Sequence, residues 1–374
     1  MKKITLSLVL ILLVVPRLLR TVGYEAREND SRLYTRFVKQ LSEKPITHVI
    51  ALEWQNLSPY GDPENPYVRD HLVGQFIPSV ILTKLGWDWR YSHYTVNQLY
   101  RFFIPWLFFL IFSFISTKQA SLFVLVAMHL NPMALNYGLR ANQEQPLVFA
   151  LALAIWGYFN LSLKRGRVAL YLGSLFAFLV KGLAGLTFFP FWGLHALFNW
   201  RSNRDQVYYL LGVALFLAFC ALGYELWFES VTGFPFWEAY FNIQVFGRRS
   251  AQGSTPFGSL GYYFLRSISY SLPWVFGLYF IFKSEKKSKE KEILSLFGLL
   301  SVGVVLIFGY FGRKASRYIF PVYYFLTSLG ALGISKRVKK EISLDGLNLH
   351  LILYWAIFLI QFLVYCYKGK TYIV

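Results

Sequence analysis

The sequence predicts an all-α membrane protein that crosses the bilayer about eleven times, because of its composition and its apolar segments. Of the 374 residues, 56% are hydrophobic and 15% are charged, and the mean hydropathy is +0.42. Soluble domains carry about 25% charged residues, so this chain has too little polar surface to cover a soluble globule of its size. The same composition excludes a disordered chain, a collagen-like chain and a disulfide scaffold.

Eleven segments are apolar enough to be membrane spans, because a spanning helix needs about 20 mostly apolar residues. A secretory signal peptide is the alternative for the first of them. However, Pro16 and Arg17 interrupt its expected end and no cleavage site of small residues follows, so an uncleaved helix is the better interpretation. The predicted spans are 4–23, 102–116, 120–138, 146–163, 168–180, 184–199, 206–224, 262–282, 292–311, 318–334 and 347–366.

Basic residues collect in short connections on one side of this threading, for example at Lys118, at Lys164 and in the run 283–292. Short cytoplasmic loops carry an excess of Lys and Arg, so that side is predicted to be the cytoplasm. The net charge of +19 then reflects topology and gives no reason to expect a nucleic-acid partner. Two long segments face outward, outer loop 1 (24–101) and outer loop 2 (225–261). Residues 1–374 are expected to form one transmembrane domain, with no separate soluble domain.

Outer loop 1 is predicted to begin with an amphipathic helix that lies flat on the outer leaflet. Leu33, Phe37 and Leu41 recur at helical spacing, with charged and polar residues on the other face. Asp30 stands at the start of this helix. It is either an N-cap, a role that Asp serves well, or a functional carboxylate just above the membrane. The residue type alone favours neither.

Basic residues on the outer side exceed what the positive-inside rule allows. One misplaced cation can extend its charge to the interface, but seven cations from five connections suggest a shared anion. Arg forks and Lys amines would hold several phosphate oxygens, and a phosphate at this depth implies a lipid-linked substrate. The seven residues are Arg140, Lys181, Arg248, Arg249, Arg313, Lys314 and Arg317.

Acidic residues also favour the outer side, where 13 of the 19 lie in this threading. They include Asp30, Asp70 and Glu144. No predicted helix centre carries an acid, so a proton relay through the bilayer lacks its usual residues.

Several sequence patches resemble, in order, the protein O-mannosyltransferases and the 4-amino-4-deoxy-L-arabinose lipid A transferases. These are C-type (GT-C) glycosyltransferases of the membrane. Besides Asp30 and its helix, the patches are Arg140–Leu147 (RANQEQPL), Leu179–Leu186 (LVKGLAGL), Phe241–Asn242 with Arg248–Arg249, Tyr262–Tyr263 with Pro273–Trp274, and Lys314–Pro321 (KASRYIFP).

The chain also departs from this family pattern. The family's Glu-Lys-Pro-Pro in the first outer loop has no clear match, and Asp70-His71 occupies about that place. His71 would then replace a phosphate-binding Lys. Leu183 stands where the family has a Pro after Lys181-Gly182.

The resemblance implies an inverting transfer of a sugar from a polyprenyl-phosphate donor to a lipid, protein or glycan acceptor. The reaction would take place on the periplasmic face of a bacterial inner membrane, in a multi-pass protein. Asp30 is expected to be the catalytic base, and Glu144, Asp70 and His71 are expected to orient the acceptor or hold a cation. The residues expected to bind the donor phosphate are Lys181, Arg248, Lys314 and Arg317, with Arg140 and Tyr318 in support.

Four alternatives stay open, two for the site residues and two for the function. A divalent metal ion is a possible cofactor, because Asp30, Asp70, His71 and Glu144 are suitable ligands, although their spacing is not diagnostic. A lone loop histidine such as His71 is more often simply hydrogen-bonded. Inverted repeats in the sequence would support a flippase for a lipid-linked saccharide, and none is visible. A non-catalytic scaffold would not need the outer acids and bases.

Overall fold

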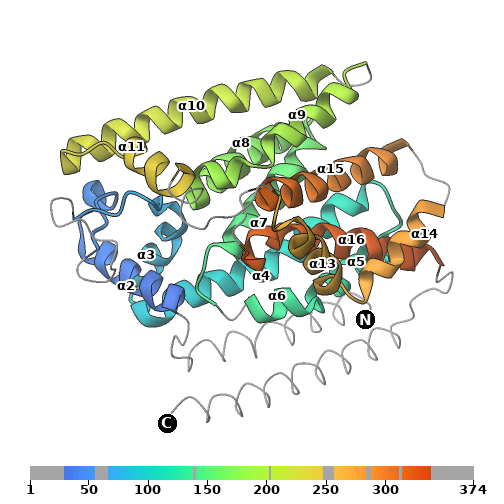
Figure 1. The fold of residues 1–374 in the computed structure, drawn as a ribbon, viewed down its shortest axis with the longest axis horizontal. Helices are drawn as coiled ribbons and strands as arrows, with labels where there is room; N and C mark the ends of the chain where they lie inside the picture. The colour runs from blue at the N-terminus through green and yellow to red at the C-terminus, as the bar shows by residue number, and fades with distance from the viewer. Residues whose placement is uncertain are drawn as a thin grey trace, which may run out of the picture.

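A computed structural model of the protein describes residues 29–54, 66–137, 140–201, 204–246, 257–283, 288–310 and 314–337. These residues form a bundle of helices (Figure 1), with one isolated antiparallel bridge between Glu53 and Tyr67. Five described helical segments are long and apolar enough to cross a membrane: Trp89–Ser113, Lys164–Leu186, Arg204–Thr232, Lys289–Tyr310 and Ser316–Arg337. The predicted spans 4–23 and 347–366 lie outside the described residues.

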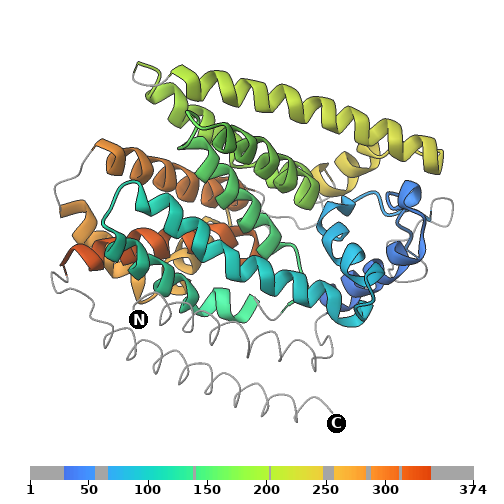
Figure 2. The same ribbon diagram turned by 180° about the vertical axis from the view of Figure 1, so that it is seen from behind.

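The long helices follow the predicted spans and extend beyond most of them. Helices α8 (Lys164–Lys181), α10 (Arg204–Thr232) and α15 (Ser288–Tyr310) run roughly parallel along the bundle (Figure 1). Helix α4 (Trp89–Ser113) crosses it diagonally when seen from behind (Figure 2). It packs against α2 (Asn29–Glu43), α5 (Lys118–His129) and α7 (Glu144–Tyr158). The remaining bounds are α9 Phe189–Phe198 and α16 Phe320–Arg337.

Two predicted spans are broken in the structure. Span 120–138 becomes α5 and the short helix α6 (Pro132–Tyr137). Asn131 separates them, because its Oδ1 accepts hydrogen bonds from the backbone N–H of Met133 (2.9 Å) and Ala134 (3.0 Å) and so caps a new helix that has Pro at its first position. Span 262–282 becomes α13 (Leu260–Tyr270), a 3₁₀ turn at Trp274–Phe276 and α14 (Gly277–Lys283).

The amphipathic helix of outer loop 1 is present as α2, but protein covers its apolar face. Phe37, Val38 and Leu41 are fully buried. The Phe37 ring lies 5.7 Å from both the Trp54 ring and the Phe76 ring, measured between centroids. The expectation that this face rests on the outer leaflet is therefore wrong, because outer loop 1 folds over the helix.

The predicted outer and inner segments collect at opposite ends of the bundle. In Figure 1, α2, α3 (Ile77–Lys84) and α11 (Trp237–Tyr240) lie toward the left end. The starts of α10 and α15 and the end of α16 lie at the right end. There Lys336 contacts Glu290 at 2.7 Å and Gln206 donates to Glu292 at 2.7 Å. This separation is what the threading requires.

Glycines allow backbone contact between α16 and the segment that runs from the Trp274 turn into α14. A Cβ atom at Gly330 would lie 1.9 Å from the Trp274 carbonyl oxygen, and one at Gly277 would lie 1.9 Å from the Gly330 carbonyl oxygen. Backbone atoms cannot move aside as a flexible side chain can. Any side chain at these positions would therefore push the helices apart.

We expect Gly330→Ala to lower the free energy of unfolding by about 2 kcal/mol or more, because overpacking a tight contact costs roughly this much. Thermal unfolding in detergent measures the change. Gly298→Ala on α15 is the matched control, because a Cβ atom there meets no other atom within 4 Å and Ala favours the helix. Equal melting temperatures for the two variants would contradict the packing argument.

Candidate active site

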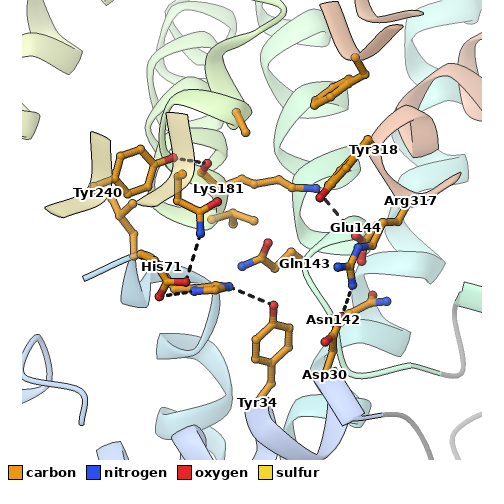
Figure 3. Close-up of a pocket in the computed structure, with 16 residues that line it drawn as sticks. Asp30, Tyr34, His71, Asn142, Gln143, Glu144, Lys181, Tyr240, Arg317 and Tyr318 are labelled. Carbon is orange, nitrogen blue, oxygen red and sulfur yellow. Dashed lines mark hydrogen bonds and ion pairs between the residues drawn. The ribbon is translucent and has the colours of Figure 1, made fainter. Parts of the chain in front are cut away.

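One cavity near the predicted outer end of the bundle brings together seven of the predicted site residues (Figure 3). Its volume is about 650 Å³, including its open mouth. The residues come from segments far apart in the sequence, so the fold gathers them. They are Asp30, Asp70, His71, Glu144, Lys181, Arg317 and Tyr318.

Asp30 lies in the first turn of α2 and forms an ion pair with Arg317, whose Nη1 donates to Oδ2 of Asp30. Arg317 belongs to the 3₁₀ helix η6 (Ser316–Ile319), which precedes α16. Because Asp30 follows the first residue of α2, it is not the N-cap. The two side chains are 36% and 34% exposed, so a ligand in the cavity can reach both of them.

Glu144 and Lys181 face each other across the cavity at the ends of two packed helices. Glu144 is the first residue of α7 and Lys181 is the last of α8. Their side chains are only 4% and 11% exposed, and Nζ of Lys181 lies 3.8 Å from Oε1 of Glu144. The other oxygen of Glu144, Oε2, is buried without a hydrogen bond. This oxygen is therefore an acceptor that a bound ligand can satisfy.

An aromatic wall stands beside Lys181. Its Nζ lies 5.7 Å from the centroid of the Tyr318 ring, within range of a cation–π interaction. Tyr318 in turn stacks on Phe308 of α15, with the centroids 5.1 Å apart and the rings 15° from parallel. The wall limits where the Lys181 amine can lie.

Asp70 and His71 form a third polar group, with Tyr34 of α2. Nδ1 of His71 lies 2.8 Å from Oδ1 of Asp70, and Nε2 lies 3.4 Å from the Tyr34 hydroxyl. Burial, and then the charges of Asp30 and Glu144, raise the pKa of Tyr34 well above its usual value. The phenol thus stays protonated at physiological pH and is able to donate to Nε2.

Two of the other predicted residues, Arg140 and Lys314, do not line the cavity. Arg140 lies over the Tyr137 ring, with Cζ 4.5 Å from the centroid. Lys314 is exposed. Arg248 lies outside the described residues. Among the residues that the structure describes, no three His, Cys, Asp or Glu side chains lie close enough together to hold a metal ion.

Neutral polar residues complete the lining, and the sequence did not single them out. Asn142 and Gln143 stand in the loop before α7, and Gln244 donates from its Nε2 to Oδ2 of Asp70 at 3.1 Å. Tyr240 contacts the backbone at Lys181. Asn142 and Gln143 do belong to the patch at 140–147, which was a usable signal. Nothing distinguishes Tyr240 from the other tyrosines, of which the chain has 26 in all.

Two solved structures share this fold, both of ArnT from Cupriavidus metallidurans. The structure bound to undecaprenyl phosphate has a TM-score of 0.66 and 16% sequence identity, and the match covers 89% of this chain and 60% of that chain. The apo structure has a TM-score of 0.61 and 15% sequence identity, and the match covers 94% of this chain and 63% of that chain. The chain thus spans less than two thirds of the length of these ArnT structures.

No protein-family model and no curated protein sequence matches the chain, so the likeness rests on structure. It extends over about nine tenths of this chain. The resemblance expected from the sequence patches is confirmed at the level of the fold: the chain has the fold of ArnT, a C-type (GT-C) lipid A aminoarabinose transferase.

Proposed function

We propose that the protein is an integral-membrane glycosyltransferase that moves a sugar from a polyprenyl-phosphate donor to an acceptor at the outer face of the membrane. The main support is a single cavity that holds the accessible carboxylate of Asp30 together with the cations Lys181 and Arg317. Undecaprenyl phosphate, which is bound in one of the ArnT structures of the same fold, is a polyprenyl phosphate and adds support.

In this proposal, the carboxylate of Asp30 takes the proton of the acceptor hydroxyl as the oxygen attacks the anomeric carbon. The bond from that carbon to the donor phosphate oxygen breaks, and its electron pair stays on the phosphate. Lys181 and Arg317 stabilise the charge that develops there. A single displacement inverts the anomeric centre, whereas a retaining path would add a second displacement with a carboxylate as nucleophile.

Arg317 has two partners in this scheme. Without a donor it neutralises Asp30, as the ion pair in the structure indicates. A donor phosphate competes for the same guanidinium, because Arg pairs well with phosphate oxygens. Binding of the donor would then leave the Asp30 carboxylate free to accept a proton. Glu144, with its unpaired Oε2, would orient hydroxyl groups of the sugar or of the acceptor.

A reconstituted assay tests the proposed activity. Purified protein in lipid vesicles receives a radiolabelled polyprenyl-phosphate sugar and, as the acceptor source, extracts of membrane lipids, proteins and glycans. We expect label in a new glycosidic product. Label that crosses the vesicle bilayer without forming such a product in any extract would establish a flippase in place of the transferase.

We also expect the cavity to open to the periplasm, in a protein of the bacterial inner membrane. Single cysteines in a variant that lacks Cys220 and Cys366 test this with an impermeant thiol reagent. Cysteine at Ile46, which is 78% exposed in outer loop 1, should react in intact spheroplasts. Cysteine at Ser288 should react only after permeabilisation. The reverse pattern would invert the topology and contradict the proposed site.

A further inference from the structure

The chain turns sharply between Lys181, at the end of α8, and the 3₁₀ helix η3 (Gly182–Leu186). Gly182 makes this turn with φ of 57° and ψ of −136°. Residues with a side chain rarely adopt this conformation. The backbone at the turn determines where the Lys181 side chain enters the cavity.

The hydroxyl of Tyr240 fills the inside of this turn. It donates a hydrogen bond to the Lys181 carbonyl oxygen (3.2 Å) and accepts one from the Leu183 N–H (3.1 Å). Figure 3 shows the first of these two hydrogen bonds. A Cβ atom at Gly182 would lie 2.4 Å from this oxygen. The phenol thus occupies the space that a side chain would need, and it satisfies a backbone group on each side of the turn.

Contacts from the side of α10 hold the Tyr240 ring. Tyr240 is 4% exposed, and its ring stacks on Phe236 with the centroids 5.9 Å apart. The carboxylate of Glu225 on α10 accepts hydrogen bonds from the backbone N–H of Phe236 (3.1 Å) and Trp237 (3.0 Å). A continuous set of contacts therefore runs from α10 through α11 to the backbone of Lys181.

We propose that Tyr240 is a positioning residue that fixes the Lys181 amine in the cavity for binding of the donor phosphate. This inference rests on the proposed function, because it assumes that Lys181 binds that phosphate. The described hydrogen bonds of the Tyr240 hydroxyl join it to backbone groups of Lys181 and Leu183. With the turn held, Nζ lies between Oε1 of Glu144 and the Tyr318 ring. Without the hydroxyl, the turn loses both restraints and the amine samples other positions.

Tyr240→Phe tests the proposal, because it keeps the ring and removes both hydrogen bonds. Binding of undecaprenyl phosphate to the purified protein is measured for the wild type, Tyr240→Phe, Lys181→Ala and the double variant. We expect the dissociation constant to rise about 5-fold in Tyr240→Phe and about 30-fold in Lys181→Ala. When Lys181 is already replaced by Ala, Tyr240→Phe should change the dissociation constant by less than about 2-fold, because no amine remains to be positioned.

Tyr158→Phe is the matched control. Tyr158 is equally buried, at the opposite end of the bundle, and its hydroxyl contacts His195 Nδ1 and Gln206 Oε1 at 2.9 Å each. We expect Tyr158→Phe to lower the melting temperature about as much as Tyr240→Phe does and to leave the affinity for undecaprenyl phosphate unchanged. The positioning role alone would be overturned if Tyr240→Phe left the affinity for undecaprenyl phosphate unchanged. It would also be overturned if Tyr240→Phe weakened binding by the same factor in the wild type and in Lys181→Ala. Unchanged affinity in Lys181→Ala would instead overturn the donor site of the proposed function.

Discussion

Asp30→Asn is expected to reduce the rate of sugar transfer by at least about 100-fold while the protein stays folded. An amide cannot take the proton of the acceptor hydroxyl, and general base catalysis contributes roughly 100-fold to 10,000-fold. The fold should tolerate the change because Asp30 is 36% exposed, and ion pairs at such sites contribute about 1 kcal/mol or less. The initial rate in the reconstituted assay, together with the melting temperature, gives the result.

Glu43→Gln provides the comparison for this variant. Glu43 ends the same helix, is largely exposed and pairs with Lys39 at 3.9 Å, so it loses a similar surface charge at a distance from the cavity. It should transfer sugar at the wild-type rate. If Asp30 only favours the start of α2 through its charge in the first turn, Asp30→Asn should leave the rate of sugar transfer near the wild-type value. Nearly full activity in Asp30→Asn would therefore assign Asp30 a structural role.

Lys181→Ala is expected to weaken binding of the polyprenyl-phosphate sugar by about 2 kcal/mol, or about 30-fold, through loss of a charge-assisted contact. Arg317→Ala should act similarly. Lys84→Ala is the control, because Lys84 is an outer cation whose amine donates to the Lys44 carbonyl, apart from the cavity lining. If Lys181 and Arg317 only anchor helices, the two variants will insert differently into the membrane while their affinity for the donor stays unchanged.

Loss of Lys181 has a second effect that must be separated from the first. It leaves Glu144, with a side chain only 4% exposed, as a buried carboxylate without its cation, which destabilises the fold. Adding Glu144→Gln removes that charge. We expect the double variant Lys181→Ala/Glu144→Gln to recover melting temperature but not donor affinity. Recovery of both would mean that Lys181 acts on the donor only by keeping the fold intact.

The sequence predicted most of the charged residues that line the cavity, because few residue types carry charge and because the side predicted to be outer has an unusual excess of cations. It did not identify which cations share the cavity. Arg140 and Lys314 have the same chemistry as Lys181 and Arg317, yet Arg140 lies over Tyr137 and Lys314 is exposed. Spacing along the chain places a residue at a helix end, while the direction of its side chain depends on packing between distant helices.

Hydropathy predicted where the long helices lie along the chain better than it predicted where a span is divided into two helices. A window of apolar residues averages over a single polar residue, so the span expected at 120–138 gave no sign of the cap at Asn131. Tyr240 and Gln244 were missed for a related reason. Their roles arise from contacts with Lys181 and Asp70, at sequence separations of 59 and 174, and a neutral side chain leaves no local signal of such a partner.

The covered face of α2 has a consequence for how the protein can be handled. Because Phe37, Val38 and Leu41 are buried by other parts of the chain, detergent extraction should leave the contacts of these three side chains intact. The candidate base then keeps its surroundings in a micelle. Differences in activity between micelles and bilayers should therefore originate with the delivery of the lipid-linked donor, and bilayer composition should act on the supply of substrate more than on the shape of the site.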